Sequence, residues 1–147
     1  MLKSQGIESR DLANAESSFV QVAMKPSYVS IDSSSADMST VTLKKQFFAE
    51  AILSQSGKYG MYGEPTDVKV IKVDPSSGLY LLSFTTLTPS MRESDRRAYV
   101  ATKIVGDGVY MLVAGSSLVR FKGQDSLLRK VADSFEVLEA PKSSLRR

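Results

Sequence analysis

The second half of the chain alternates short apolar runs with turn sequences, and this pattern leaves few folds open. Asp74-Pro75-Ser76-Ser77-Gly78 has the residues that β-turns prefer, and Gly106-Asp107-Gly108 is a strong hairpin signal. Strands that are joined by short turns pair with their neighbours in sequence. The pattern therefore predicts an antiparallel meander. Its strands are Val68–Val73, Leu79–Thr86, Tyr99–Val105 and Val109–Ala114.

Two other segments have the period of a helix. Leu43, Phe47 and Ala51 recur every four residues, which predicts a first helix over Thr42–Gln55. Gln124–Ser134 is predicted as a second helix. Its core face consists of Leu127, Leu128, Val131 and Ala132. Strands that meander, with helices between and after them, predict an α+β domain whose antiparallel sheet is covered by two helices.

Changes in amino-acid composition along the chain predict where the domain begins and ends. Phe19–Met24 is predicted as its first strand, ended by Pro26, and Phe135–Leu138 can add a last strand. The residues before Phe19 are polar, with at most a short strand around Ile7. We therefore divide the chain into a partly flexible N-terminal extension, 1–18, one domain, 19–140, and a basic tail, 141–147.

Charge and length exclude several classes of protein. The chain has 147 residues, enough for one domain with a real core, and no apolar run approaches the roughly 20 residues that span a bilayer. Lysine and arginine number 19 against 16 acidic residues, and three of these cations lie in the tail. The rest of the chain is therefore neutral, whereas a nucleic-acid binder usually carries a basic excess on its fold. We expect no nucleic-acid partner.

The chain has no cysteine and no histidine, so the commonest general base and most metal ligands are missing. Three pairs of carboxylates lie close in sequence: Glu93 with Asp95, Asp32 with Asp37, and Glu136 with Glu139. All are expected in polar loops or near the chain end, where carboxylates are usually solvated. Ser116 and Ser117 have no neighbouring histidine to activate them. We expect no catalytic residues, no metal and no cofactor.

The best functional candidate is a basic cluster. If the loop before the strand at Tyr99 and the turn before the second helix lie on one side, their cations form a basic rim that could meet an acidic partner. The alternative is a solvated charge cluster that Glu93 and Asp95 partly neutralise. The residues of this predicted interface are Arg92, Arg96, Arg97, Arg120 and Lys122.

The C-terminal third has an ordered set of motifs. A strand with Tyr110 leads to Phe121-Lys122-Gly123, then a helix, then Ser134-Phe135-Glu136-Val137. These motifs, and the step from Phe121 to Phe135, resemble the PsbP family, the extrinsic lumenal proteins of photosystem II and their relatives. Under this resemblance Gly123 makes a sharp turn into the helix, and Phe121 and Phe135 hold the two ends of the helix on the sheet.

The resemblance implies a PsbP-like α-β-α sandwich in the chloroplast thylakoid lumen, monomeric by itself. Its partner would be a photosynthetic membrane complex, photosystem II first, or else photosystem I or the chloroplast NDH-like complex. Binding would support assembly or stability of that complex. Where the photosystem II subunit has an Arg-His step this chain reads Arg96-Arg97-Ala98, so the metal role of that histidine is not carried over. Two alternatives remain open: a Ran-binding nuclear import factor of the same fold, and a small-molecule carrier.

Overall fold

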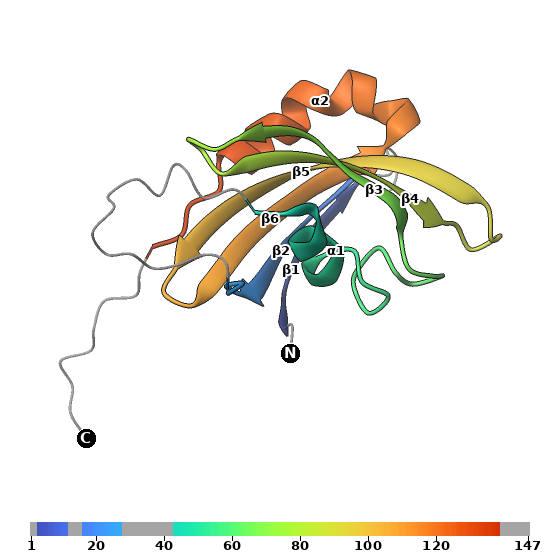
Figure 1. Ribbon diagram of the computed structural model, residues 1–147. Coiled ribbons are helices and arrows are strands. Elements are labelled where there is room, and N and C mark those ends of the chain that lie inside the picture. The colour runs from blue at the N-terminus through green and yellow to red at the C-terminus, as the bar shows by residue number, and fades with distance from the viewer. Residues whose placement is uncertain (1–2, 12–15, 28–42, 139–147) are drawn as a thin grey trace.

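Each of the four apolar runs in the second half forms a strand in the computed structural model, which describes residues 3–11, 16–27 and 43–138. Within these ranges six antiparallel strands form one sheet, in the order β1-β2-β6-β5-β4-β3 (Figure 1). The strands are β1 (Lys3–Asp11), β2 (Glu16–Met24), β3 (Thr66–Asp74), β4 (Leu79–Leu87), β5 (Glu93–Val105) and β6 (Gly108–Ser117). The predicted antiparallel meander is confirmed, because β3, β4, β5 and β6 pair in sequence order.

Both predicted turns of the meander are present, and each uses a glycine with a positive φ. Gly106 has φ 58° in the connection between β5 and β6, and Gly78 has φ 68° before β4. At Gly78 a Cβ atom would also lie 2.6 Å from the carbonyl oxygen of Thr102. The turn therefore requires glycine both for its backbone angle and for its close approach to β5.

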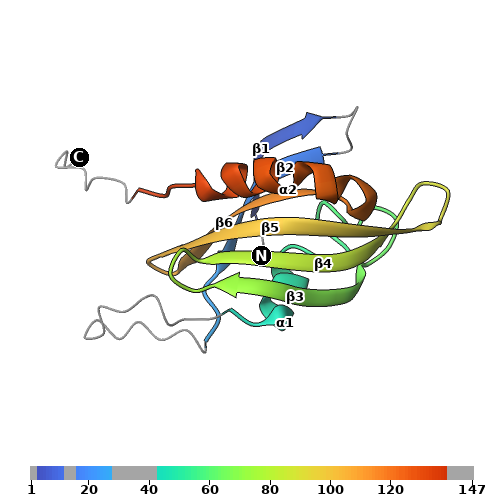
Figure 2. The same ribbon diagram turned by 90° about the horizontal axis from the view of Figure 1, so that it is seen from above.

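Successive residues of the central strands point to opposite faces of the sheet, and both faces are buried. Tyr80 and Leu82 of β4 belong to one apolar cluster, whereas Leu79 and Leu81 belong to another. Helix α1 (Lys45–Ala51) packs on the first face and α2 (Leu118–Asp133) on the second, across β5 and β6 (Figure 2). The described residues thus form helix, sheet and helix layers, as the α+β prediction requires.

The first helix is shorter than predicted. α1 ends at Ala51, although Phe48, Ile52 and Leu53 are all almost fully buried. The turns that follow complete the cover, with the ring of Tyr59 packed 5.7 Å from Phe19 and 4.8 Å from Phe84. The helix also begins later than predicted, at Lys45, because Leu43 and Lys44 are not helical; Thr42 itself lies outside the described residues.

The second helix is longer than predicted and begins at Leu118, so Phe121-Lys122-Gly123 lies inside it. The predicted sharp turn at Gly123 is therefore wrong. Leu128 and Ala132 are buried and Val131 partly so, as expected, but Leu127 is 50% exposed. After the helix, Phe135–Leu138 has no regular structure and does not form the predicted last strand.

The N-terminal residues belong to the sheet. Lys3–Asp11 forms β1, which pairs with β2 and places a hairpin at the β6 side of the meander. The boundary that we drew between residues 18 and 19 therefore falls within β2, and the segment before it is not a separate extension. The predicted basic tail, 141–147, lies outside the described residues.

Gly123 gives a direct test of the helix that replaces the predicted turn. Gly123→Ala should raise the free energy of unfolding by about 0.5–1 kcal/mol. Glycine is less favourable than alanine inside a helix, and a Cβ atom added at residue 123 meets no atom within 4 Å. Urea denaturation measures the change. Gly78→Ala is the control and should destabilise by at least a similar amount, because alanine is strained at a positive φ. Loss of stability in Gly123→Ala would contradict a helical Gly123.

The two phenylalanines of the predicted helix anchors should differ in their contribution to stability. Phe121 is 5% exposed within the α2 cluster, whereas Phe135 is only partly buried against it. We expect Phe121→Ala to cost about 3–5 kcal/mol of unfolding free energy, and Phe135→Ala clearly less. Equal losses in the two variants, measured by urea denaturation, would show that both ends of the helix are anchored alike.

Candidate functional site

The predicted basic cluster is distributed over three places in the fold. Arg92 precedes β5 in its connection from β4, Arg96 and Arg97 lie within β5 itself, and Arg120 and Lys122 lie in the first turns of α2. Arg96 pairs in register with Ser117, the residue before α2. The start of β5 and the start of α2 are therefore at the same end of the sheet.

Arg96 and Arg97 point to opposite faces because they are neighbours on a strand. The guanidinium carbon of Arg96 lies 5.6 Å from the ring centroid of Tyr59, on the α1 face. The guanidinium of Arg97 lies 5.7 Å from the ring of Phe121, on the α2 face. The prediction of one continuous basic rim is wrong for Arg96, which belongs to the other side of the molecule.

The start of α2 brings together three of the predicted residues: Arg97, Arg120 and Lys122. Arg120 and Lys122 flank the buried Phe121 and are both exposed. Further along the helix Arg129 and Lys130 are also exposed, and Arg129 forms an ion pair of 3.8 Å with Asp133. Four exposed cations on one helix outnumber its two carboxylates, those of Asp125 and Asp133, so the outer surface of α2 is net positive.

Apolar side chains lie among these cations. Val119 is 92% exposed, Leu127 is 50% exposed, and Leu118 is 40% exposed. We call the exposed side chains of Leu118, Val119, Arg120, Lys122, Leu127, Arg129 and Lys130 the α2 outer face. It combines exposed apolar area with positive charge on one helix, and positive charge is complementary to acidic surfaces.

The helix begins with an unfavourable arrangement of charge. The positive end of a helix dipole is stabilised by nearby acidic side chains, yet the first turn of α2 has none. Ser117, at the N-cap, forms no side-chain hydrogen bond to the helix. Arg120 and Lys122 add positive charge to this end. The start of α2 therefore carries a positive potential that does not serve the stability of the helix.

A partly buried polar contact joins α2 to the sheet. The hydroxyl of Tyr99 on β5 donates a hydrogen bond to the carboxylate of Asp125. Burial, together with this carboxylate, raises the pKa of Tyr99 to about 12, because both disfavour the phenolate. The neutral hydroxyl is therefore the form that joins the two layers.

The other candidate groups have ordinary structural surroundings. Asp95 accepts a hydrogen bond of 2.9 Å from the hydroxyl of Thr85, and Ser116 is fully buried with its hydroxyl 3.2 Å from the carbonyl oxygen of Ser117. Asp32, Asp37 and Glu139 lie outside the described residues. Within the described part of the chain, no three acidic, histidine or cysteine side chains are grouped as metal ligands would be.

The sequence prediction missed part of the α2 outer face. Leu118 and Val119 were missed because the predicted helix began six residues too late at Gln124, whereas Arg129 and Lys130 lay within the predicted helix and were not singled out. With the helix begun at Leu118, the period of 3.6 places Phe121, Leu128 and Ala132 inward and leaves those four outside.

Comparisons with known proteins leave the family of this chain open, since no family model and no curated protein matches it. Neither helix in the described ranges has both the length and the apolar character needed to span a bilayer.

The Tyr99–Asp125 hydrogen bond should make stability depend on alkaline pH. The pKa of Tyr99 is raised from 10 to about 12 on folding, so its contribution is complete below pH 10 and is lost as the pH rises toward 12. The loss should be on the order of 1–3 kcal/mol. Tyr99→Phe, which costs about 1 kcal/mol at neutral pH, should show a smaller loss. Urea denaturation between about pH 9 and 11.5 measures both slopes. Equal slopes would show that Tyr99 is not the titrating group.

Proposed function

We propose that this chain is a non-catalytic, PsbP-like protein of the chloroplast thylakoid lumen that docks on a photosynthetic membrane complex and supports its assembly or stability. Photosystem II is the first candidate partner. The observation that carries the docking role is the α2 outer face, with its four exposed cations and three exposed apolar side chains. The resemblance of the C-terminal third to the PsbP family supports the location and the partner.

The charge of this face suits an acidic partner in two ways. Exposed cations at the start of α2 add to the positive end of the helix dipole and attract acidic surfaces over about 8 Å at physiological salt. That attraction raises the rate of encounter more than the final affinity. The exposed Val119 and Leu118 supply apolar area that would be buried after encounter. Docking on this face should therefore weaken as salt concentration rises.

The helix is also fixed before it binds. Phe121 is buried in the α2 cluster and stacks 5.8 Å from the ring of Tyr99, whose hydroxyl bonds to Asp125. A helix that is held by a buried ring and by a hydrogen bond one turn further on loses little conformational freedom on binding. The outer side chains can thus be replaced without disturbing the contacts that hold the helix.

Charge reversal on the α2 outer face tests the proposal. We expect Arg120→Glu with Lys122→Glu to weaken binding to salt-washed thylakoid membranes, and to photosystem II purified from them, by at least about tenfold at low salt, since repulsion replaces attraction. The matched control is Lys69→Glu with Lys72→Glu, an equal change of charge at exposed positions of the edge strand β3, whereas α2 packs on the central strands β5 and β6. Arg96 and Arg97 are poorer probes, because both pack on aromatic rings.

Cosedimentation at two salt concentrations separates the outcomes. Loss of binding in the α2 variant alone, with the wild type weakened by salt, supports docking through this face. Absence of wild-type binding to the membranes and to the purified complex would reject the proposed partner. Equal weakening in both double variants would show that only net charge matters and that α2 is not the docking surface.

A further inference from the structure

Strand β5 extends beyond its neighbour β4 at the end of the sheet away from the start of α2. The first residue of β4, Leu79, pairs with Ala101. Gly78 still accepts a hydrogen bond of 2.8 Å from the backbone N–H of Thr102, but the residues before it form the turn from β3. Among the described residues, no strand therefore pairs with residues 103–105 on this side of β5. We call these residues the open edge.

The backbone N–H and C=O groups of Ile104 face the gap that β4 leaves. In an antiparallel pair, every second residue directs both groups to the same neighbour. Thr102 directs its N–H to Gly78, and the pairing of β5 with β6 runs without irregularity from Arg96 to Val105. Ile104, two residues after Thr102, therefore directs its groups to the β4 side, where the described chain offers no strand. An unpaired donor and acceptor on a sheet edge form a template for another strand.

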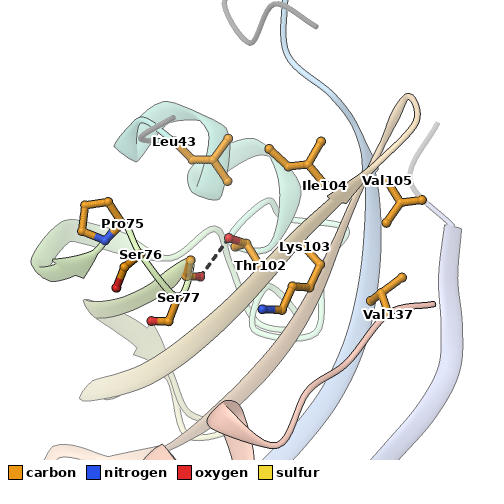
Figure 3. A pocket seen from close by; sticks show the side chains of 10 residues that line it. Leu43, Pro75, Ser76, Ser77, Thr102, Lys103, Ile104, Val105 and Val137 are labelled. Atoms are coloured by element: carbon orange, nitrogen blue, oxygen red, sulfur yellow. Dashed lines mark hydrogen bonds between the residues drawn. The ribbon is translucent and has the colours of Figure 1, made fainter. Parts of the chain in front are cut away.

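A cavity with a volume of about 280 Å³ lies beside the open edge, bounded on its far side by the turn between β3 and β4 (Figure 3). Its lining comes from both faces of β5. Ile104 belongs to the α1 face, whereas Lys103 and Val105 point to the α2 face. Leu43 borders the cavity on the first face and Val137, which follows α2, on the second. A compact ligand cannot contact both faces of one strand, but an extended peptide can, because its side chains alternate between the faces.

The walls of this cavity are fixed without a ligand. The hydroxyl of Thr102 donates to the carbonyl oxygen of Gly78 at 2.8 Å. Asp74 accepts hydrogen bonds from the side chains of Ser76 and Ser77. These hydroxyls are therefore already used within the wall. The groups left for a ligand are the backbone of the open edge and the side chains on its two faces.

We propose that the open edge binds an extended peptide segment of a partner protein, which adds to the sheet as a strand antiparallel to β5. Its central residue exchanges two hydrogen bonds with Ile104 and lays an apolar side chain against Ile104 and Leu43. The residue after it lies opposite Lys103, where a carboxylate meets the ammonium group. The residue before it lies opposite Val105 and packs an apolar side chain on Val137. In this mode the backbone hydrogen bonds supply affinity and the alternating side-chain sites supply selectivity.

The acidic residue is placed by a single charge. Lys103 is the only charged residue among the described residues that border the cavity, so its position fixes where the carboxylate of the peptide lies. This binding is independent of the proposed docking through α2, because none of the α2 outer face borders the cavity.

Titration of the full chain with the peptide acetyl-Val-Val-Glu-amide, followed by amide NMR shifts, tests the inference. We expect saturable shifts at Ile104 and its neighbours in the open edge and in the turn before β4, with a Kd on the order of 1 mM, because few groups are contacted. The same peptide N-methylated at its central valine lacks the donor that Ile104 accepts. It should bind at least about tenfold more weakly.

A charge exchange tests the order of the side chains. Lys103→Glu should weaken binding of acetyl-Val-Val-Glu-amide at least about fivefold and strengthen that of acetyl-Val-Val-Lys-amide, because repulsion and attraction change places. Lys69→Glu, at an exposed position of β3, is the matched control and should keep the preference of the wild type. The comparison of two peptides on one folded variant is not mimicked by a general loss of stability.

Hydrogen exchange of single amides gives a second readout. In the free chain the Ile104 amide should exchange much faster than that of Thr102, which is bonded to Gly78. The peptide at about ten times its Kd should slow exchange at Ile104 about tenfold. Slow exchange of Ile104 in the free chain would show that another part of the chain, or a second copy, already covers the edge. That result, shifts that map elsewhere, equal binding of the N-methylated peptide, or an unchanged preference in Lys103→Glu would each overturn the proposal.

Discussion

The constraint on which the rest of this structure depends is that its central strands are buried on both faces. Along β4, Leu79 to Leu82 are all buried, with alternate side chains in different apolar clusters. An antiparallel sheet often leaves one face to water, but this one cannot, because each large apolar side chain exposed would cost about 1.5–3 kcal/mol. Both helices are therefore obligatory layers, and any surface used for binding must lie on their outer sides, at the ends of the sheet or along exposed edge strands such as β3.

The two layers meet this requirement differently. α2 covers its face as one regular element, since its inward residues Phe121, Leu128 and Ala132 follow a single stripe. α1 has only seven residues, so the turns after it complete the cover through Ile52, Leu53 and Tyr59. In a regular helix the outward side chains take no part in packing the core. The exposed side chains of the other layer, Met61 and Tyr62 among them, lie in turns and not along one regular element.

Much of this fold could be predicted from the sequence, because turns and core strands depend on local chemistry. Gly78 and Gly106 stand where the backbone needs positive φ, and the runs between them are apolar. For β1 the sequence allowed at most a short strand around Ile7, since Lys3–Asp11 is mostly polar and its full length as a strand depends on pairing with β2. The start of α2 at Leu118 could not be predicted either. Gly123 in Phe121-Lys122-Gly123 favours a turn locally, and the tertiary packing of Phe121 overrides that preference.

The candidate site was harder to predict because adjacent charges in sequence need not be adjacent in space. Arg96 and Arg97 are consecutive, yet the strand period sends one to Tyr59 and the other to Phe121. On α2 the helical period turns successive side chains by about 100°. Phe121 therefore points inward, while Arg120 and Lys122 lie on its two flanks. Arg97 links the strand to the helix, because its guanidinium lies over the ring of Phe121. Phe121 anchors the helix that carries Arg120 and Lys122. The positive end of the molecule is thus built from both layers, and its geometry follows from the burial of Phe121.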